Sequence, residues 1–220
     1  MKETSEGVYI NNGKILTRNL TPGIKFYGED TVIVTGKEYR VWDPYRSKPA
    51  AAIKKGLKHF PIKPKNKILY LGIANGNTAS FFSDIIGPDG IIYGVEISER
   101  SIRDLLQTSE KRKNIAPILA NARKPETYNW IEKVDVVYQD VATRDQSDII
   151  IRNAEAFLKP DGYAVIAIKA RSIDVIQKPK KIFTQEIRKL SKHFKILEKV
   201  ELDPYEQDHL FAVMKLRKRT

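Results

Sequence analysis

Two charged residues, Asp140 and Lys169, each end an apolar run and could act together on a ligand. Asp140 follows the run VDVVYQ, and Lys169 follows AVIAI. If these runs are neighbouring parallel strands, their carboxyl ends place both side chains in one crevice, which is where open parallel sheets bind ligands. A lysine beside an aspartate can move or orient a proton. A purely structural ion pair is the alternative, because such pairs also bring a lysine next to an aspartate.

A glycine-containing turn, GIANGN, begins at Gly72 and follows the apolar run ILYL. The next apolar run ends at Glu96, 24 residues after Gly72, close to the offset at which a carboxylate accepts hydrogen bonds from ribose hydroxyls. A dinucleotide fingerprint would have glycine where this turn has Ala74 and Asn77. The pattern therefore favours a ligand with ribose and adenine but no pyrophosphate, such as S-adenosylmethionine. A helix start with a surface glutamate is the alternative.

The elements that must position these residues alternate between strand and helix from residue 67 onward. Strands are expected at Ile68–Leu71, Ile91–Val95, Ile115–Leu119, Val134–Tyr138, Tyr163–Ile168, Phe194–Glu201 and His209–Leu216. Helices are expected at Thr78–Ile86, Ser98–Lys111, Gln146–Leu158 and Lys180–His193. This alternation predicts an α/β fold with a mainly parallel seven-stranded sheet. Only DPYEQD separates the last two strands, so they should form an antiparallel hairpin. A helix ended by Pro160-Asp161-Gly162 and followed by an apolar strand is typical of methyltransferases, although any helix-to-strand turn is the alternative.

Residues 1–45 have a different pattern, with short β-like runs: GVYI, KILTRNL, IKFYG, TVIVTG and EYRVW. Asn12-Gly13, Pro22-Gly23 and Gly36 separate these runs as turns would, so hairpins are expected. A helix should begin near Pro49, where proline suits a first helical turn. We therefore expect a small antiparallel β unit in residues 1–55 and a methyltransferase domain in residues 56–220.

The composition points to an intracellular protein with a polyanionic partner. Lys and Arg number 39 against 27 acids, a net charge of +12, which favours nucleic acid because neutralised phosphates release counterions. A lysine- and glutamate-rich surface of a heat-adapted protein is the alternative. The chain has no cysteine and three scattered histidines, so neither thiolate chemistry nor a metal site is expected. No apolar run could span a bilayer, and no secretory signal is visible. The basic residues 215–220 fit a solvated end.

Five segments resemble the fibrillarin family of RNA 2'-O-methyltransferases, in its archaeal form. They are VWDPYRSKPAAAI, ILYLGIANGNTASFFSDIIGPDGIIYGVEIS, DVVYQDVA, AVIAIKARSIDV and LDPYEQDHLFAVM. The resemblance implies a Rossmann-type methyltransferase fold and transfer of a methyl group from S-adenosylmethionine to ribose in ribosomal and transfer RNA. It also implies work within a box C/D ribonucleoprotein, with a guide RNA, a Nop-family scaffold protein and a kink-turn-binding ribosomal-type protein. The expected location is the cytoplasm of an archaeon, with no membrane contact.

The same resemblance implies the site residues. The catalytic set is Lys48, Asp140, Lys169 and His209. The cofactor set is Gly72, Ala74, Asn75, Gly76, Asn77, Thr78, Glu96, Ile97, Asn121, Ala122, Asp140, Val141, Ala142 and Thr143. The chain departs from the family at Asn75 and Asn77, which replace Ser and Thr, at Pro49, which replaces Leu, and at Thr143, which replaces Gln. Asn75 and Asn77 can still donate and accept hydrogen bonds, whereas Pro49 removes a backbone donor beside Lys48.

Lys169 is the candidate general base, because burial and a nearby sulfonium would both lower its pKa. Lys48 and His209 would contact the substrate ribose or its phosphates. RNA contacts are expected from Arg46, Lys48, Arg123, Lys124 and Arg171, extended by Lys178, Lys180 and Lys181. No sequence-reading RNA motif is visible, so target choice would come from guide RNA pairing. Two alternatives stay open: a methyltransferase of the same fold that modifies a protein side chain, and a non-catalytic RNA-binding subunit.

Overall fold

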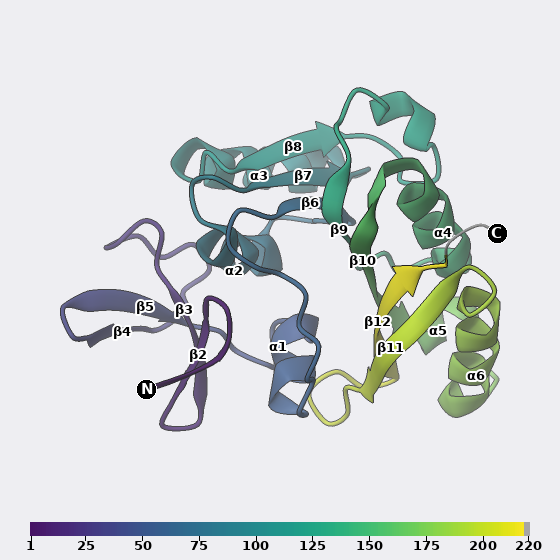
Figure 1. Cartoon of the computed structure of the whole chain (residues 1–220), viewed down its shortest axis with the longest axis horizontal. Coiled ribbons are helices and arrows are strands. Elements are labelled where there is room, and N and C mark those ends of the chain that lie inside the picture. Colours follow the sequence, from purple (N-terminus) through teal and green to yellow (C-terminus); the bar gives the residue numbers. More distant parts are fainter. Residues whose placement is uncertain (218–220) are drawn as a thin grey trace.

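The computed structural model describes residues 1–217, in which two β sheets are joined by helices (Figure 1). The last three residues of the basic stretch 215–220 lie outside the described residues. The elements in chain order are β1 (Lys2–Ser5), β2 (Val8–Asn11), β3 (Lys14–Arg18), β4 (Thr31–Val34), β5 (Lys37–Val41), α1 (Lys48–Lys54), β6 (Lys67–Leu71), α2 (Asn77–Ile86), β7 (Ile91–Glu96), α3 (Glu99–Lys111), β8 (Ile115–Leu119), the 3-10 helix η1 (Pro125–Tyr128), β9 (Val134–Gln139), α4 (Gln146–Phe157), β10 (Leu158–Lys169), α5 (Ala170–Ile173), α6 (Pro179–Leu190), β11 (Phe194–Glu201) and β12 (His209–Leu216).

The larger sheet has seven strands in the order β11-β12-β10-β9-β6-β7-β8. The pairs among β10, β9, β6, β7 and β8 are parallel, whereas β12 runs antiparallel to both β10 and β11. Residues of α1, α2 and α3 pack on one face, and residues of α4, α6 and η1 pack on the other. The predicted fold class, a mainly parallel seven-stranded sheet with a final antiparallel hairpin, is therefore confirmed.

The smaller sheet is antiparallel, in the order β1-β2-β3-β5-β4. Its tight hairpins turn at Asn12-Gly13, with φ of 48° and 75°, and at Thr35-Gly36, with φ of 47° and 73°. Positive φ at both central residues matches the twist of the flanking strands, which is why Asn-Gly predicts such a turn. Figure 1 shows this sheet beside the larger one, with α1 and α2 near their junction.

The structure differs from the predicted elements in three places. The run IKFYG is not a strand, because the backbone amides of Phe26 and Tyr27 donate to the Glu29 carboxylate instead of to a neighbouring strand. Residues 2–5 form a strand, β1, that the sequence did not predict. The expected turn at residues 160–162 lies inside β10, which begins at Leu158 and contains a register shift between Leu158 and Tyr163.

The two sheets share one hydrophobic cluster. It contains Val8, Ile15 and Trp42 from the N-terminal segment together with the buried face of α1 and α2. Trp42 stacks on Phe81 of α2, with ring centroids 5.3 Å apart. Burial of these rings removes apolar surface of both units from water at one place. The division of the chain at residue 55 stays a prediction. Among residues 1–217 no helix is both long enough and apolar enough to cross a membrane.

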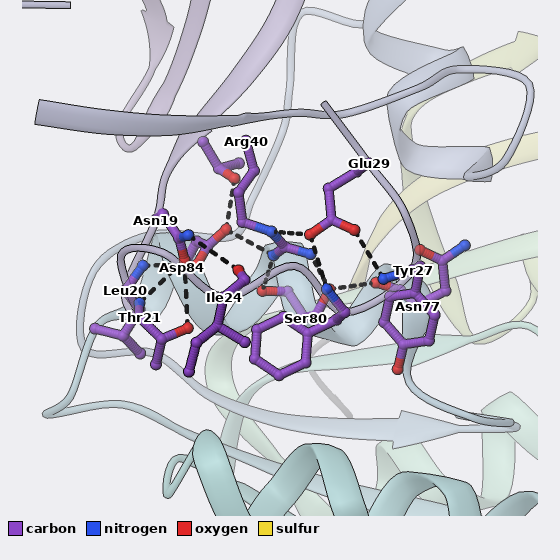
Figure 2. A network of polar contacts seen from close by, with 12 residues as sticks. Asn19, Leu20, Thr21, Ile24, Tyr27, Glu29, Arg40, Asn77, Ser80 and Asp84 are labelled. Atoms are coloured by element: carbon purple, nitrogen blue, oxygen red, sulfur yellow. Dashed lines mark hydrogen bonds and ion pairs between the residues drawn. The ribbon is translucent and has the colours of Figure 1, made fainter. Parts of the chain in front are cut away.

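A buried ion cluster crosses the same junction. Asp84 of α2 forms ion pairs with Arg40 of β5 at 2.9 Å and with Arg112 at the end of α3 at 2.7 Å, and all three side chains are 0% exposed. Arg40 also pairs with Glu29 at 2.6 Å (Figure 2). Charges without water are tolerated only when they are paired and hydrogen-bonded, so the cluster holds the small sheet to α2.

We expect Asp84→Ala to lower the free energy of unfolding by about 3–5 kcal/mol, because it leaves buried Arg112 without its carboxylate and Arg40 with Glu29 alone. Urea unfolding measures the change. The control is Asp89→Ala, whose carboxylate is 69% exposed and lies 3.8 Å from Lys65; its effect should stay within about 0.5 kcal/mol. Equal effects of the two substitutions would contradict the importance of the buried cluster.

Candidate active site

The candidate site lies at the carboxyl ends of β6 and β9, where the strand order of the large sheet reverses. From β6 the chain continues outward to β7 and β8, and from β9 it continues to β10 on the other side. Gly72 directly follows β6, and Asp140 directly follows β9. The backbone amide of Asp140 donates to the Leu71 carbonyl at 3.0 Å. A Cβ on Gly72 would lie 2.8 Å from the Asp140 carbonyl oxygen. Only glycine allows this close approach of the two strand ends.

The turn after β6 has an unusual backbone. Gly72, Ala74 and Gly76 have φ of 75°, 52° and 92°, and a non-glycine residue in this region costs about 1–2 kcal/mol. Glu96 stabilises the turn, because its Oε2 accepts from the Ala74 amide at 3.0 Å. Its Oε1 accepts from the amides of Ile97 and Ser98, both at 2.9 Å. A carboxylate has about four acceptor positions, so Glu96 can still accept from a ligand.

A cavity of about 230 Å³ opens beside this turn. Its lining residues are Gly72, Ala74, Val95, Glu96, Ile97, Ala120, Asn121, Ala122, Arg123, Asp140, Val141, Ala142, Thr143 and Ile149. These residues fit S-adenosylmethionine chemically: aliphatic side chains can contact adenine, a carboxylate can accept from ribose hydroxyls, and a second carboxylate carries charge opposite to a sulfonium. Ala120, Val95 and Ile149 were not predicted, and nothing but their place at or near strand ends could have indicated them.

The rest of the predicted cofactor set, Asn75 to Thr78, does not line that cavity. Asn77 and Arg46 instead line a separate cavity of about 340 Å³, which contains residues of β3, β5 and α2. The Thr78 hydroxyl lies 2.9 Å from the hydroxyl of Ser47, and the Asn75 carbonyl accepts from Tyr27. The second half of the turn therefore faces the N-terminal segment.

The ion pair of the site joins Asp140 to Lys48, with Nζ and Oδ2 2.9 Å apart and side chains 20% and 23% exposed. Burial acts to lower the pKa of Lys48, but the adjacent Asp140 carboxylate outweighs it, so that pKa is raised above its usual value. Lys48 begins α1 and Asp140 directly follows β9. The sequence placed Lys169 beside Asp140 as its possible ion-pair partner; the structure gives that place to Lys48, because α1 packs with its alanine face against the sheet.

Lys169 and His209 are paired in the antiparallel register of β10 and β12. Lys169 is exposed, so the structure does not bury it as the sequence analysis expected. His209 is 4% exposed, and its Nδ1 lies 2.7 Å from the Gln207 carbonyl, which identifies Nδ1 as the donor. Its Nε2 is buried and has no hydrogen-bond partner within residues 1–217. Burial lowers the pKa of His209 below its usual value, and Lys48 acts in the same direction.

The pH dependence of stability should report His209. An unfolded histidine takes up a proton near pH 6.5, whereas buried His209 does so only at lower pH. The unfolded state therefore binds more protons as the pH falls below 6.5, and the protein loses stability in that window. His209→Gln should reduce the slope between pH 6.5 and 5 by up to about 1.4 kcal/mol per pH unit. Urea unfolding across this range measures the slope. The assignment would be contradicted if the substitution left the slope below pH 6.5 unchanged. It would also be contradicted if the difference in unfolding free energy between the two proteins still varied between pH 7.5 and 8.5.

A buried glutamine that the sequence analysis missed connects two strand ends. Gln146, 0% exposed, accepts from the Lys169 amide at 3.0 Å through Oε1, and its Nε2 donates to the carbonyls of Thr143 and Lys169. Gln139 donates to the Gln146 carbonyl at 2.6 Å. The signal available in the sequence for this connection was Gln139, a polar residue at the end of the apolar run VDVVYQ. These bonds fix the backbone at Lys169 while its side chain stays exposed.

The expected RNA contacts are mostly engaged with protein groups. Arg123 donates to both oxygens of Asp145 at 2.7 Å, which holds the pKa of that carboxyl at about 2. Arg171 pairs with Asp208 at 2.8 Å, and Arg46 donates to the Tyr27 carbonyl at 2.9 Å. Lys124 is exposed. The described part of the chain contains no group of three or more histidines and acids placed to hold a metal.

Comparison with known proteins places this geometry in a family. The family model described as Fibrillarin matches residues 1–218. The chain belongs to the fibrillarin family. The fibrillarin-like rRNA/tRNA 2'-O-methyltransferase of Pyrococcus furiosus is 50% identical over 221 residues, which cover 97% of each chain. The resemblance predicted from five segments is thus confirmed along nearly the whole chain.

Two solved fibrillarin structures have the same fold. Aeropyrum pernix fibrillarin in complex with natively bound S-adenosyl-L-methionine superposes with a TM-score of 0.85 at 50% identity, over 91% of this chain and 88% of that one. A structure of a fibrillarin/Nop5p complex superposes with a TM-score of 0.88 at 39% identity, over 96% and 98% of the two chains. The fibrillarin family therefore includes one structure with the methyl donor and one with a Nop-type protein.

Proposed function

We propose that this chain transfers the methyl group of S-adenosylmethionine to ribose 2'-hydroxyls of ribosomal and transfer RNA. The observation that carries the proposal is the cavity at the strand-order reversal, which is lined by Glu96 and by Asp140, the ion-pair partner of Lys48. The 50% identical relative from Pyrococcus furiosus is named for this activity, and the Aeropyrum pernix fibrillarin carries the donor.

Different residues of the cavity would contact the adenine, the ribose and the sulfonium of the donor. Val95, Ile97 and Ile149 line the cavity and would provide apolar contact for adenine, and Glu96 would accept from the ribose hydroxyls. The bound cofactor supplies an electrophilic methyl group on a positively charged sulfur. Asp140 provides a compensating charge at the end of β9. Because the Asp140 carboxylate forms an ion pair with Lys48, that carboxylate is positioned before the donor binds.

The chain must also hold the acceptor hydroxyl in line with the methyl group and receive its proton. Lys169 is the candidate base, at the end of β10. Lys169 is exposed in the structure, so the bound acceptor strand, rather than the protein, would have to remove it from water. His209 lies beside it and is neutral at neutral pH, since burial lowers its pKa. His209 and Lys48 would contact the ribose or its phosphates.

Target choice in this proposal comes from a box C/D guide RNA. The excess of positive charge, +12 over the whole chain, favours sequence-independent attraction to RNA, and pairing with the guide supplies the sequence. A Nop-family scaffold protein, as in the fibrillarin/Nop5p structure, and a kink-turn-binding ribosomal-type protein would position the enzyme on the guide and target RNA. The complex would work in the cytoplasm. The N-terminal β unit and the apolar helix face next to it are the proposed scaffold contact.

Reconstitution tests the proposal. The protein is combined with S-adenosylmethionine, a box C/D guide RNA, both partner proteins and a target RNA, and the methylated riboses are mapped. A guide with its pairing region changed to a second target is the control, and methylation should move with it. Ribose methylation absent from the guided position would falsify the proposal. Methylated protein would favour the same-fold protein methyltransferase, and RNA binding without any transfer would favour a non-catalytic subunit.

A further inference from the structure

One side chain of the N-terminal segment reaches the glycine turn. The Tyr27 hydroxyl donates to the Asn75 carbonyl at 2.5 Å and lies 3.2 Å from the Thr108 hydroxyl of α3. The turn follows β6, whereas α3 follows Glu96 at the end of β7. Tyr27 therefore links the turn, whose Gly72 and Ala74 line the candidate cofactor cavity, to α3, although it precedes both of them in the chain and lies outside the parallel sheet.

The Tyr27 hydrogen bond adds to the bonds that already hold the turn, among them that of the Gly76 amide with the Ile73 carbonyl at 3.1 Å. Ala74 has a φ of 52°, in a region that non-glycine residues rarely adopt. The Glu96 carboxylate holds the Ala74 amide on one side. On the other side, a Cβ on Gly76 would lie 2.6 Å from Leu105 and 3.2 Å from the Tyr27 hydroxyl. The second half of the turn is thus packed against Tyr27 and α3, and the Tyr27 hydrogen bond is one of its polar contacts with the N-terminal segment, beside that of Thr78 with Ser47.

Tyr27 is itself held by the buried ion cluster (Figure 2). Its amide donates to Glu29 Oε2 at 2.8 Å, and Glu29 Oε1 accepts from Arg40 at 2.6 Å. Arg40 donates in turn to the carbonyl and the hydroxyl of Ser80, at 3.1 and 2.9 Å. Because Ser80 belongs to α2, which begins at the turn, Tyr27 is fixed relative to the helix whose entry it supports.

The charge state of Tyr27 suits this role. Burial raises the pKa of its hydroxyl above the usual value. The group therefore stays protonated at neutral pH and can donate to a carbonyl, which accepts only. A phenylalanine would keep the ring and its packing but would leave the Asn75 carbonyl without this donor.

We propose that Tyr27 is a positioning residue of the cofactor site, through which the N-terminal sheet holds the glycine turn in its binding conformation before the cofactor arrives. The inference rests on the proposed function, since S-adenosylmethionine is the cofactor assumed. A turn that is only partly in its binding conformation weakens the apparent affinity by the fraction that is competent. The N-terminal sheet thus contributes to cofactor affinity in addition to any contact with partners.

Hydrogen exchange on the cofactor-free protein is the first test. Tyr27→Phe should increase exchange of the amides in residues 72–78 by about two- to tenfold, because the hydrogen bond that it removes is of that strength. Tyr9→Phe is the matched control. It removes a tyrosine hydroxyl from β2 of the N-terminal sheet, where the ring packs edge-on against Tyr39 with ring centroids 5.3 Å apart. Exchange of the turn in this control should equal that of the unmodified protein.

Calorimetric titration with S-adenosylhomocysteine is the second test. The Kd of Tyr27→Phe should rise by about two- to tenfold, and that of Tyr9→Phe should stay unchanged. The inference requires both changes in Tyr27→Phe: if either the exchange or the Kd stays as in the unmodified protein, it is overturned, even where the melting temperature falls. Failure of the unmodified protein to bind this ligand would instead count against the proposed function, and the exchange test would still decide whether Tyr27 holds the turn.

Discussion

Replacing Lys169 with alanine should lower kcat for guided methylation by about 10²- to 10⁴-fold, the usual contribution of a general base. The Kd for S-adenosylhomocysteine should stay within about twofold, because Lys169 is exposed at the end of β10 and is not among the residues that line the cofactor cavity. Its backbone is fixed by Gln146, so truncation of the side chain leaves the strand end in place. Single-turnover kinetics and calorimetry measure the two quantities.

Two further substitutions decide what Lys169 does. Lys169→Arg keeps the positive charge but cannot give up a proton at accessible pH, so it should be as impaired as alanine if Lys169 is a base and should retain most activity if it only positions the substrate. Lys192→Ala is the control, an exposed lysine between α6 and β11 at the opposite end of the strands. A large loss of cofactor affinity in Lys169→Ala would make Lys169 a cofactor ligand instead.

Asp140→Asn should weaken binding of S-adenosylmethionine by about tenfold more than binding of S-adenosylhomocysteine. The first ligand has a positively charged sulfur and the second is neutral there, so the difference isolates the attraction of the Asp140 carboxylate. The substitution should also lower kcat by about 10²- to 10³-fold, as loss of one group that stabilises charge in the reacting state does. It leaves Lys48 without its partner at 2.9 Å. Calorimetry with both ligands and single-turnover kinetics measure these effects.

Two matched variants separate the charge of Asp140 from its ion pair. Lys48→Met keeps the carboxylate and should preserve the preference for the charged ligand, whatever it does to catalysis. Asp161→Asn removes an exposed carboxylate of β10, eight residues before Lys169 and outside the cavity lining, so it should leave the affinity for both ligands unchanged. Equal loss of affinity for the two ligands in Asp140→Asn would show that Asp140 acts through the structure of the turn rather than through its charge.

The sequence alone determined the layers of the fold and the edge that carries the site. Apolar runs and helical periodicity are local signals, and an alternating strand-helix order requires parallel strands whose carboxyl ends meet at one edge. Gly72, Glu96, Asp140 and Lys169 could therefore be assigned to that edge before any coordinates. The strand IKFYG was wrongly predicted because β propensity cannot reveal that the nearby Glu29 captures its amides.

Only the tertiary structure decided which side chains meet there. Asp140 pairs with Lys48, 92 residues away, because packing of α1 on the sheet brings the two together, whereas Lys169 remains exposed. The link from Tyr27 to Asn75 spans 48 residues and depends on the buried charges of Arg40, Glu29 and Asp84. A residue's own neighbours in the chain determine whether it forms a strand or a helix. Its partner across a site depends on how whole elements pack, and that packing is set by contacts far apart in the sequence.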